Sequence, residues 1–392
     1  NTMLARPEAK VALPKEQVRL LEQVREVLSD WKDSSDAERD HVCWDRMTAA
    51  REAYREDTRL GIDGETQALI CGDLHPILTE FQEKVAVGIQ RSKERSPGVP
   101  PTYFTYRAID AEEVPDANGQ PERDDQGRPY VRVKRFEPVL LPPFLEGPVH
   151  ALKVQPDAES ARSVHEQVKE SDLFDQKLGM YKVNASLKDE SHEIGRAKAF
   201  PPGWLENESI WLHMEYKYLL ELLRAELYEE FYEAIQTALV PFQPPARYGR
   251  SPLENSSFIA SSAHPDPSCH GAGFVARLSG STAEFLSIWT AMMAGRRPFR
   301  MGDGGLELRL DPALPGWFFT EEGTVSFRFL GQCDVTYHNP SRSDTYAEGV
   351  EPRRIVLRPS EAEAVEIEGD TIGSPYAERI RNGGIERVEV FF

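Results

Sequence analysis

The sequence predicts a mainly α-helical chain that ends in a small antiparallel β domain. Apolar residues recur at helical spacing through much of residues 1–300, most clearly in residues 15–30. The period then changes to two, as in residues 306–310, where apolar and charged side chains alternate. We therefore expect two domains, a helical one over residues 1–300 and a β domain over residues 301–392.

An apolar stripe predicts each helix, and a capping residue marks the start of several. The predicted helices cover residues 15–30, 36–59, 73–95, 157–169, 204–239 and 281–295, with a break in the fifth pattern near residues 224–226. Short β-branched and aromatic runs predict strands at residues 102–106, 130–133, 306–310, 325–329, 335–337, 355–357 and 388–390. A polar tract between the first two strands predicts a hairpin loop.

The charge, apolar content and cysteine spacing of the chain exclude several classes of binding partner. The net charge is −19 over 392 residues, so the surface repels phosphate backbones and nucleic acid is not expected to bind. No run of about 18 apolar residues is present, so we expect no membrane span. An apolar signal segment is not visible either, and we expect a cytoplasmic protein. The cysteines are far apart without a CxxC spacing, which predicts free thiols and no zinc site: Cys43, Cys71, Cys269 and Cys333.

Three loop segments concentrate polar and aromatic groups, and the first is Phe200–His213. It contains two carboxylates, an amide and two indoles: Trp204, Glu206, Asn207, Glu208 and Trp211. Glu206 and Glu208 are two positions apart and cannot share a helix face, so only one is expected to point into a cleft. Acids are also favoured at a helix start by the helix dipole, which is the alternative interpretation of this segment.

The second segment is Arg247–Phe258. Glu254 and Asn255 lie beside small hydroxyl side chains, and this mixture of donors and acceptors suits sugar hydroxyls. Arg250 and Glu254 are spaced to pair with each other, so a structural polar network is the alternative.

The third segment is His264–Glu284, in which Arg277, Ser279, Gly280 and Ser281 lead into a predicted helix. Backbone N–H groups and hydroxyls at such a helix start suit an anion such as phosphate. Ser281 with Glu284 three residues later also fits an ordinary capping box, which needs no ligand.

In order and context, these three segments resemble the C-terminal part of the cellobiose and chitobiose phosphorylase family, which includes cyclic β-1,2-glucan synthase-like proteins. In that family, a loop that begins with glycine leads into a helix, and this first motif ends in Trp. A segment that contains Tyr and then Glu-Pro-Tyr follows. A Thr-Gly-Ser run then begins the last helix. Cys333–Pro340 looks like the family's C-terminal strands. The resemblance covers roughly residues 200 to 340.

The resemblance implies an (α/α) barrel, or toroid, of which residues 1–300 would form a portion. The predicted helices are fewer than a complete barrel needs, so we expect an upstream segment to complete it. The resemblance further implies an inverting glycoside phosphorylase acting on a β-linked gluco-oligosaccharide, with inorganic phosphate as co-substrate and no other cofactor or metal.

The predicted site combines the three segments with the roles that the resemblance suggests. The catalytic carboxylates are expected among Glu206, Glu208 and Glu254, with one of the first two as the general acid. Contacts to the sugar are expected from Trp204, Asn207, Trp211, Asn255 and Arg277. Contacts to phosphate are expected from Ser279, Gly280 and Ser281.

Two other functions stay open. The family's phosphate-contacting histidine falls near Asn207, and its general-acid segment has no counterpart in this sequence. The chain is rich in acids, with Glu146 as a further candidate, and an inverting hydrolase needs a second carboxylate to activate water. Hydrolysis or transglycosylation of β-glucans is one alternative, and a non-catalytic fragment of a larger carbohydrate-active protein is the other.

Overall fold

The chain divides into two compact units, which we describe separately. The computed structural model describes residues 6–35, 38–96, 98–154, 157–276, 279–359 and 363–392. One unit comprises Asn1–Gly98 with Phe104–Leu141, and the other comprises Val99–Tyr103 with Pro142–Phe392. The chain therefore leaves the second unit at Phe104 and returns to it at Pro142. The domain boundary predicted at residues 300–301 lies within the second unit.

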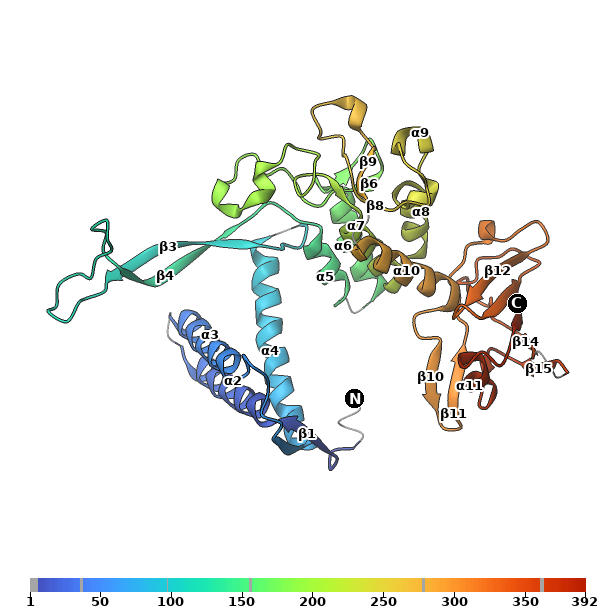
Figure 1. The fold of residues 1–392 in the computed structure, drawn as a ribbon, viewed down its shortest axis with the longest axis horizontal. Coiled ribbons are helices and arrows are strands. Elements are labelled where there is room, and N and C mark those ends of the chain that lie inside the picture. The colour runs from blue at the N-terminus through green and yellow to red at the C-terminus, as the bar shows by residue number, and fades with distance from the viewer. Residues whose placement is uncertain (1–5, 36–37, 97, 155–156, 277–278, 360–362) are drawn as a thin grey trace. The chain divides into compact units, whose positions relative to one another are not determined.

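Three helices and two β-ribbons form the first unit (Figure 1). Its helices are α2 (Lys15–Asp33), α3 (Arg39–Asp57) and α4 (Cys71–Arg95), and β1 (Lys10–Pro14) pairs with β2 (Thr66–Ile70). Val27, Leu28 and Cys43 form a small buried cluster where α2 meets α3, and Phe81 of α4 packs against it. Helix α4 buries only Leu74, so this unit has a thin core.

The second ribbon of this unit is a long antiparallel hairpin of β3 (Phe104–Glu113) and β4 (Val131–Leu140). Its register runs from the Phe104–Leu140 pair to the Glu113–Val131 pair. In the loop beyond the strands, the side chain of Asp116 accepts backbone N–H groups, as turn aspartates commonly do. The structure thus confirms the predicted hairpin.

The helices of the second unit are α5 (Glu146–Leu152), α6 (Ala158–Lys169), α7 (Leu212–Arg224), α8 (Tyr228–Ala238), α9 (Pro245–Tyr248), α10 (Ser279–Ala294) and α11 (Tyr376–Arg381). Helix α7 packs against α5, α8 and α10, and is buried on most of its circumference, so it lies inside the fold. Asp157 caps α6 by accepting the Ser160 N–H at 2.7 Å. None of the helices in the described part of the chain combines the length and apolar character that crossing a membrane requires.

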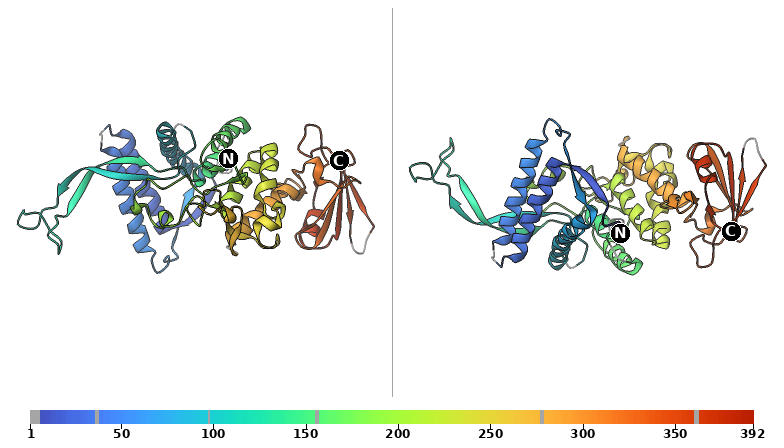
Figure 2. Two further views of the ribbon diagram at one scale, coloured as in Figure 1. Left: turned by 90° about the horizontal axis from the view of Figure 1, so that it is seen from above. Right: turned by 90° about the horizontal axis from the view of Figure 1, so that it is seen from below.

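Four small sheets complete the second unit. Two lie before residue 300: β5 (Phe174–Asp175) with β6 (Met180–Tyr181), and β7 (Ile210–Trp211) with β8 (Ser256–Ile259) and β9 (Gly273–Ala276). A third contains β10 (Phe299–Gly302), β11 (Gly305–Arg309) and β16 (Thr371–Ile372). The largest has the order β12 (Thr324–Phe329), β13 (Cys333–His338), β17 (Arg387–Phe391), β14 (Arg354–Arg358) and β15 (Val365–Glu368), and forms the red sheet of Figure 2.

One hydrophobic core joins the helices of this unit to its C-terminal strands. Tyr337 of β13 is fully buried and donates its hydroxyl to the Met293 carbonyl of α10 at 2.5 Å. The helical and β parts of the second unit are therefore packed together as one body.

The predicted fold class, mainly α with an (α/α) barrel, is wrong. The chain is 39% helix and 23% strand, with ten α-helices and several small sheets among the described residues, so it is a mixed α/β protein. The error arose because short strands such as β8, which has four residues and is buried at each of them, show no alternation of apolar and polar residues. The C-terminal sheet is also mixed rather than antiparallel throughout, since β13 and β17 run parallel.

Two predicted helix starts also need correction. The helix expected from Trp204 begins at Leu212, because the residues before it form a tight turn and strand β7. Helix α10 begins at Ser279, so Ser281 lies inside the helix and is not its N-cap. The predicted break near residues 224–226 is confirmed, since α7 ends at Arg224 and α8 begins at Tyr228.

Candidate functional site

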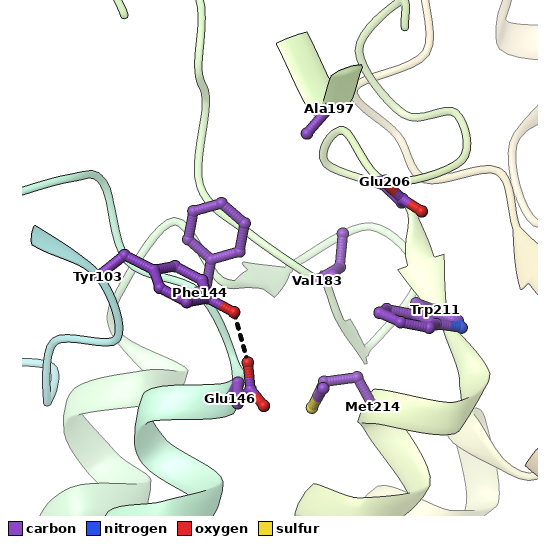
Figure 3. Close-up of a pocket in the computed structure, with 8 residues that line it drawn as sticks. All are labelled: Tyr103, Phe144, Glu146, Val183, Ala197, Glu206, Trp211 and Met214. Atoms are coloured by element: carbon purple, nitrogen blue, oxygen red, sulfur yellow. Dashed lines mark hydrogen bonds between the residues drawn. The ribbon is translucent and has the colours of Figure 1, made fainter. Parts of the chain in front are cut away.

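A cavity of about 240 Å³ lies in the second unit. Its walls combine two carboxylates with aromatic and apolar side chains: Tyr103, Phe144, Glu146, Val183, Ala197, Glu206, Trp211 and Met214. Figure 3 shows the Tyr103 and Phe144 rings on one side and the Trp211 indole on the other. Of the residues predicted for the site, Glu206 and Trp211 line this cavity, and so does the further candidate Glu146.

Backbone hydrogen bonds hold the three segments that form most of the cavity wall. The Leu145 N–H donates to the Val183 carbonyl at 2.9 Å, and the Val183 N–H donates to the Ser209 carbonyl at 2.8 Å. The Glu208 N–H donates to the buried side-chain oxygen of Asn184 at 2.6 Å. Segments that are remote in sequence thus present their side chains to one space.

Glu206 lies at the tip of a strained two-residue turn. The backbones of Trp204 and Asn207 hydrogen-bond to each other in both directions at 3.2 Å, and Leu205 between them has φ 51°. A positive φ is uncommon for a residue other than glycine and costs free energy. Gly203, before the turn, packs so closely against the His264 backbone that a Cβ on it would lie 2.4 Å from the His264 backbone nitrogen.

The Glu206 carboxylate is held by a bidentate ion pair at the edge of the cavity. Nε of Arg196 donates to Oε2 at 2.9 Å, and Nη2 donates to Oε1 at 2.5 Å. Arg196 is 77% exposed, so solvent screens this pair. The guanidinium nevertheless fixes the orientation of the carboxylate.

Glu146, the first residue of α5, is the second carboxylate of the cavity. The Tyr103 hydroxyl donates to its Oε2 at 2.6 Å, drawn as the dashed line in Figure 3. The hydrogen bond with Glu146, together with burial, raises the pKa of Tyr103 to about 12. On the other side, Nε2 of His150 lies 3.7 Å from Oε1. The two carboxyl oxygens of Glu146 thus have different surroundings.

Glu208 is turned to a different partner, in agreement with the expectation that it and Glu206 cannot share one face. It is 7% exposed and pairs with Lys182, whose Nζ lies 3.2 Å from Oε1. Its own φ of 56° is a second strained position in this segment. The structure therefore gives Glu208 an internal ion pair, whereas it places Glu206 at the cavity.

The structure brings the three predicted segments together in one sheet. Trp211 in β7 pairs with Phe258 in β8, which in turn pairs with Phe274 in β9. The Phe258 and Phe274 rings stack at 5.6 Å, and Trp204 stacks on Phe274 at 3.6 Å with an interplanar angle of 1°. One face of the Trp204 indole, which was predicted to contact the sugar, is therefore covered by Phe274.

The remaining predicted residues have protein partners. Nδ2 of Asn207 donates to the Phe200 carbonyl at 2.7 Å. Glu254 accepts from Arg250 at 2.8 Å, which confirms the predicted pair. The Tyr216 hydroxyl donates to Oδ1 of Asn255 at 3.4 Å.

The start of α10 packs against a histidine that the sequence argument did not use. A Cβ on Gly280 would lie 2.5 Å from Nδ1 of His213, so the imidazole rests directly on this glycine. The His213 ring meets the Trp211 indole edge-on at 5.7 Å, and its Nε2 lies 3.8 Å from Glu284. Burial, with Lys217 nearby, lowers the pKa of His213, so the ring is neutral at neutral pH.

The predicted phosphate contacts fall partly within this region. Ser279 begins α10, Gly280 faces His213, and Ser281 is fully buried in the first turn of the helix. Arg277 lies outside the described residues.

The site residues missed from sequence are Tyr103, Phe144, Arg196 and His213. Tyr103 was assigned to a strand because it stands in a run of aromatic and threonine residues. His213 is the last residue of the predicted segment Phe200–His213, and its position at a helix start was the available signal.

No protein-family model matches the chain, and a comparison with curated protein sequences finds no match. Among the described residues, no cluster of three or more His, Cys, Asp or Glu side chains is arranged to hold a metal ion. The chemistry of the cavity residues is therefore the basis for a functional proposal.

Proposed function

We propose that this protein binds a β-linked gluco-oligosaccharide at the cavity and cleaves a glycosidic bond by phosphorolysis. The observation that carries the proposal is that Glu146 and Glu206, from separate segments, line one cavity with Trp211 and Tyr103. Enzymes that cleave glycosidic bonds use carboxyl groups in this setting, and aromatic faces pack against sugar rings.

Glu146 is the better candidate for the general acid. Glu206 already has a bidentate cation partner, whereas Glu146 meets the neutral Tyr103 hydroxyl. In the proposed step, the Glu146 carboxyl gives its proton to the glycosidic oxygen as the bond to the anomeric carbon breaks. A phosphate oxygen forms the new bond to that carbon, and the proton that phosphate loses returns to the carboxylate.

The contact between His213 and Gly280 supports phosphate as the attacking group. A neutral imidazole can donate one hydrogen bond, and the first turn of an α-helix presents backbone N–H groups to an anion. Trp211 connects the cavity with the start of α10, because its indole lines the cavity and also contacts the His213 ring.

Glu206 favours a second candidate, hydrolysis or transglycosylation. A hydrolase needs one carboxyl group as the acid and another as the base that activates water, and the cavity offers both. Arg196 would keep Glu206 oriented for that role.

The deciding experiment incubates the protein with β-linked gluco-oligosaccharides with and without inorganic phosphate. Phosphorolysis gives sugar 1-phosphate only when phosphate is present, whereas hydrolysis releases reducing sugar at the same rate in both conditions. Binding without turnover in either condition would favour a non-catalytic carbohydrate-binding role. The absence of binding would contradict the proposal as a whole.

Variants connect the activity with the cavity. Glu146→Gln should reduce turnover by about 10²–10⁴-fold, the usual contribution of general acid catalysis. Glu366→Gln is the matched control, since Glu366 pairs with Arg354 on the C-terminal sheet. Equal activity of the two variants would remove Glu146 from the mechanism.

The same proposal includes a cytoplasmic setting, with the oligosaccharide and phosphate as partners and no further cofactor. All four cysteines are free thiols, which a reducing compartment maintains.

A further inference from the structure

The segment Val99–Tyr103 is fastened to the start of α5. The Thr102 hydroxyl donates to the Phe144 carbonyl at 2.9 Å and accepts the Gly147 N–H at 2.8 Å. A Cβ on Gly147 would lie 2.5 Å from the Pro100 carbonyl oxygen. Only glycine at this position therefore lets the segment approach the helix so closely.

This attachment places the Tyr103 side chain at the cavity. Its ring meets the Phe144 ring edge-on at 5.0 Å and an angle of 83°. Its hydroxyl lies 2.6 Å from Oε2 of Glu146, a short and strong contact for a neutral donor and a carboxylate. Tyr103 is thus held through its backbone, its ring and its hydroxyl.

The two oxygens of Glu146 are consequently not equivalent. Oε2 accepts the Tyr103 hydroxyl, whereas Oε1 lies 3.7 Å from His150, which is too long for a hydrogen bond. Oε1 is therefore the oxygen from which a proton can pass to a sugar in the cavity.

We propose that Tyr103 is a positioning residue that holds Oε2 of Glu146, so that Oε1 exchanges the proton with the substrate. This inference rests on the proposed function. The hydroxyl also stabilises the carboxylate that remains after proton transfer, because a hydrogen bond to the charged form favours that form.

The other polar groups near Glu146 have different positions or partners, whereas the Tyr103 hydroxyl donates to Oε2. His150 is on the same helix, and Glu206 lines the cavity with its charge bound by Arg196. Helix α7 contributes Met214 to the cavity, while its Glu215 is buried and accepts the Tyr181 N–H.

The test compares Tyr103→Phe with the control Tyr106→Phe, which removes the hydroxyl of an exposed tyrosine in β3. Tyr103→Phe keeps the ring and removes the donor to Glu146. Turnover should fall by about 10- to 100-fold, the range for losing a hydrogen bond to a charged group, with a smaller change in KM. The control should behave as the wild type.

A second readout does not depend on activity. Carboxyl NMR of the substrate-free protein, with the Glu146 signal assigned through Glu146→Gln, should show a higher pKa for Glu146 in Tyr103→Phe. The alkaline limb of the kcat profile, where a general acid loses its proton, should move in the same direction. Thr102→Val, which keeps Tyr103 but removes the hydroxyl that fastens its segment, should give a smaller shift.

The outcomes separate this inference from the proposed function. An unchanged Glu146 titration in Tyr103→Phe would overturn the positioning role even if the wild type cleaves oligosaccharides. A shifted titration in a protein that cleaves no oligosaccharide would overturn the proposed function, and with it a catalytic purpose for the contact.

Discussion

Gly147→Ala tests whether close packing against α5 holds the cavity together. The added Cβ would lie 2.5 Å from the Pro100 carbonyl oxygen, 2.6 Å from the Thr102 hydroxyl and 2.9 Å from the Pro101 carbonyl carbon. Two of these atoms belong to the backbone, and proline restricts how that backbone can move. The segment that carries Tyr103 must therefore shift away from the helix.

Two opposing effects determine the change in stability. Alanine is favoured over glycine inside a helix by about 1 kcal/mol, and less at a helix end. Overpacking costs roughly 1–3 kcal/mol, and separation of the segment also weakens the two Thr102 hydrogen bonds, at about 1 kcal/mol each. We therefore expect a net loss of about 1–3 kcal/mol in the free energy of unfolding.

Urea denaturation measures the loss, and Gly88→Ala is the control. Gly88 lies in α4, and a Cβ at this position would meet no other described atom within 4 Å, so its replacement should stabilise the protein by roughly 0.5–1 kcal/mol. Because the two glycines lie in different units, hydrogen exchange should follow each unit separately. If Gly147→Ala is as stabilising as the control, the reasoning about close packing is wrong.

Three further predictions concern buried polar groups. Burial raises the pKa of Glu215 well above its ordinary value, so its contribution to stability should be complete below about pH 4.5 and be lost as the pH rises through its pKa in the fold. Glu215→Gln should remove this decline in urea titrations from about pH 4 to 8, and an unchanged slope would contradict it. Lys182→Met should destabilise the fold by roughly 3–5 kcal/mol, because it leaves Glu208 buried without its partner. Replacing both by apolar residues should recover most of that loss in the same denaturation assay. Tyr337→Phe should cost about 1–2 kcal/mol and lower Tm, since the Met293 carbonyl loses its donor, and an unchanged Tm would show that this bond is dispensable.

Sequence reasoning succeeded where a few neighbouring residues decide the local structure. Helix α2 begins at Lys15 as expected, and α6 occupies Ala158–Lys169, close to the predicted residues 157–169. The break between Arg224 and Tyr228 was also visible from sequence. Capping and helical periodicity depend on contacts within one or two turns, which makes them accessible to pattern arguments.

It failed where distant contacts override the local pattern. Trp204 stands at the start of an apparently helical run, yet its backbone pairs with Asn207 and its ring stacks on Phe274. Strands β7 to β9 are only two to four residues long, and their pairing joins positions that are far apart in the sequence. Such short strands show no period by which they could be recognised.

The cavity illustrates the same limit. Glu206 and Trp211 were found because they lie in one segment dense in polar and aromatic groups, and Glu146 was named as a further acidic candidate. Tyr103 precedes the hairpin of β3 and β4 in the sequence, and Phe144 follows it. Tertiary contacts bring both residues to the cavity. Proximity of that kind is not encoded in spacing along the chain.

The hairpin of β3 and β4 has a consequence for how this protein can change in evolution. The chain departs for it directly after Tyr103 and comes back at Pro142, two residues before Phe144. Because Phe104 and Leu140 are paired, the points of departure and return are one strand spacing apart, about 5 Å. Insertions and deletions at its tip, around Asn118 and Gly119, can therefore accumulate without altering the geometry at its base. The hairpin is a site where new surface can be acquired while selection on the cavity continues unchanged.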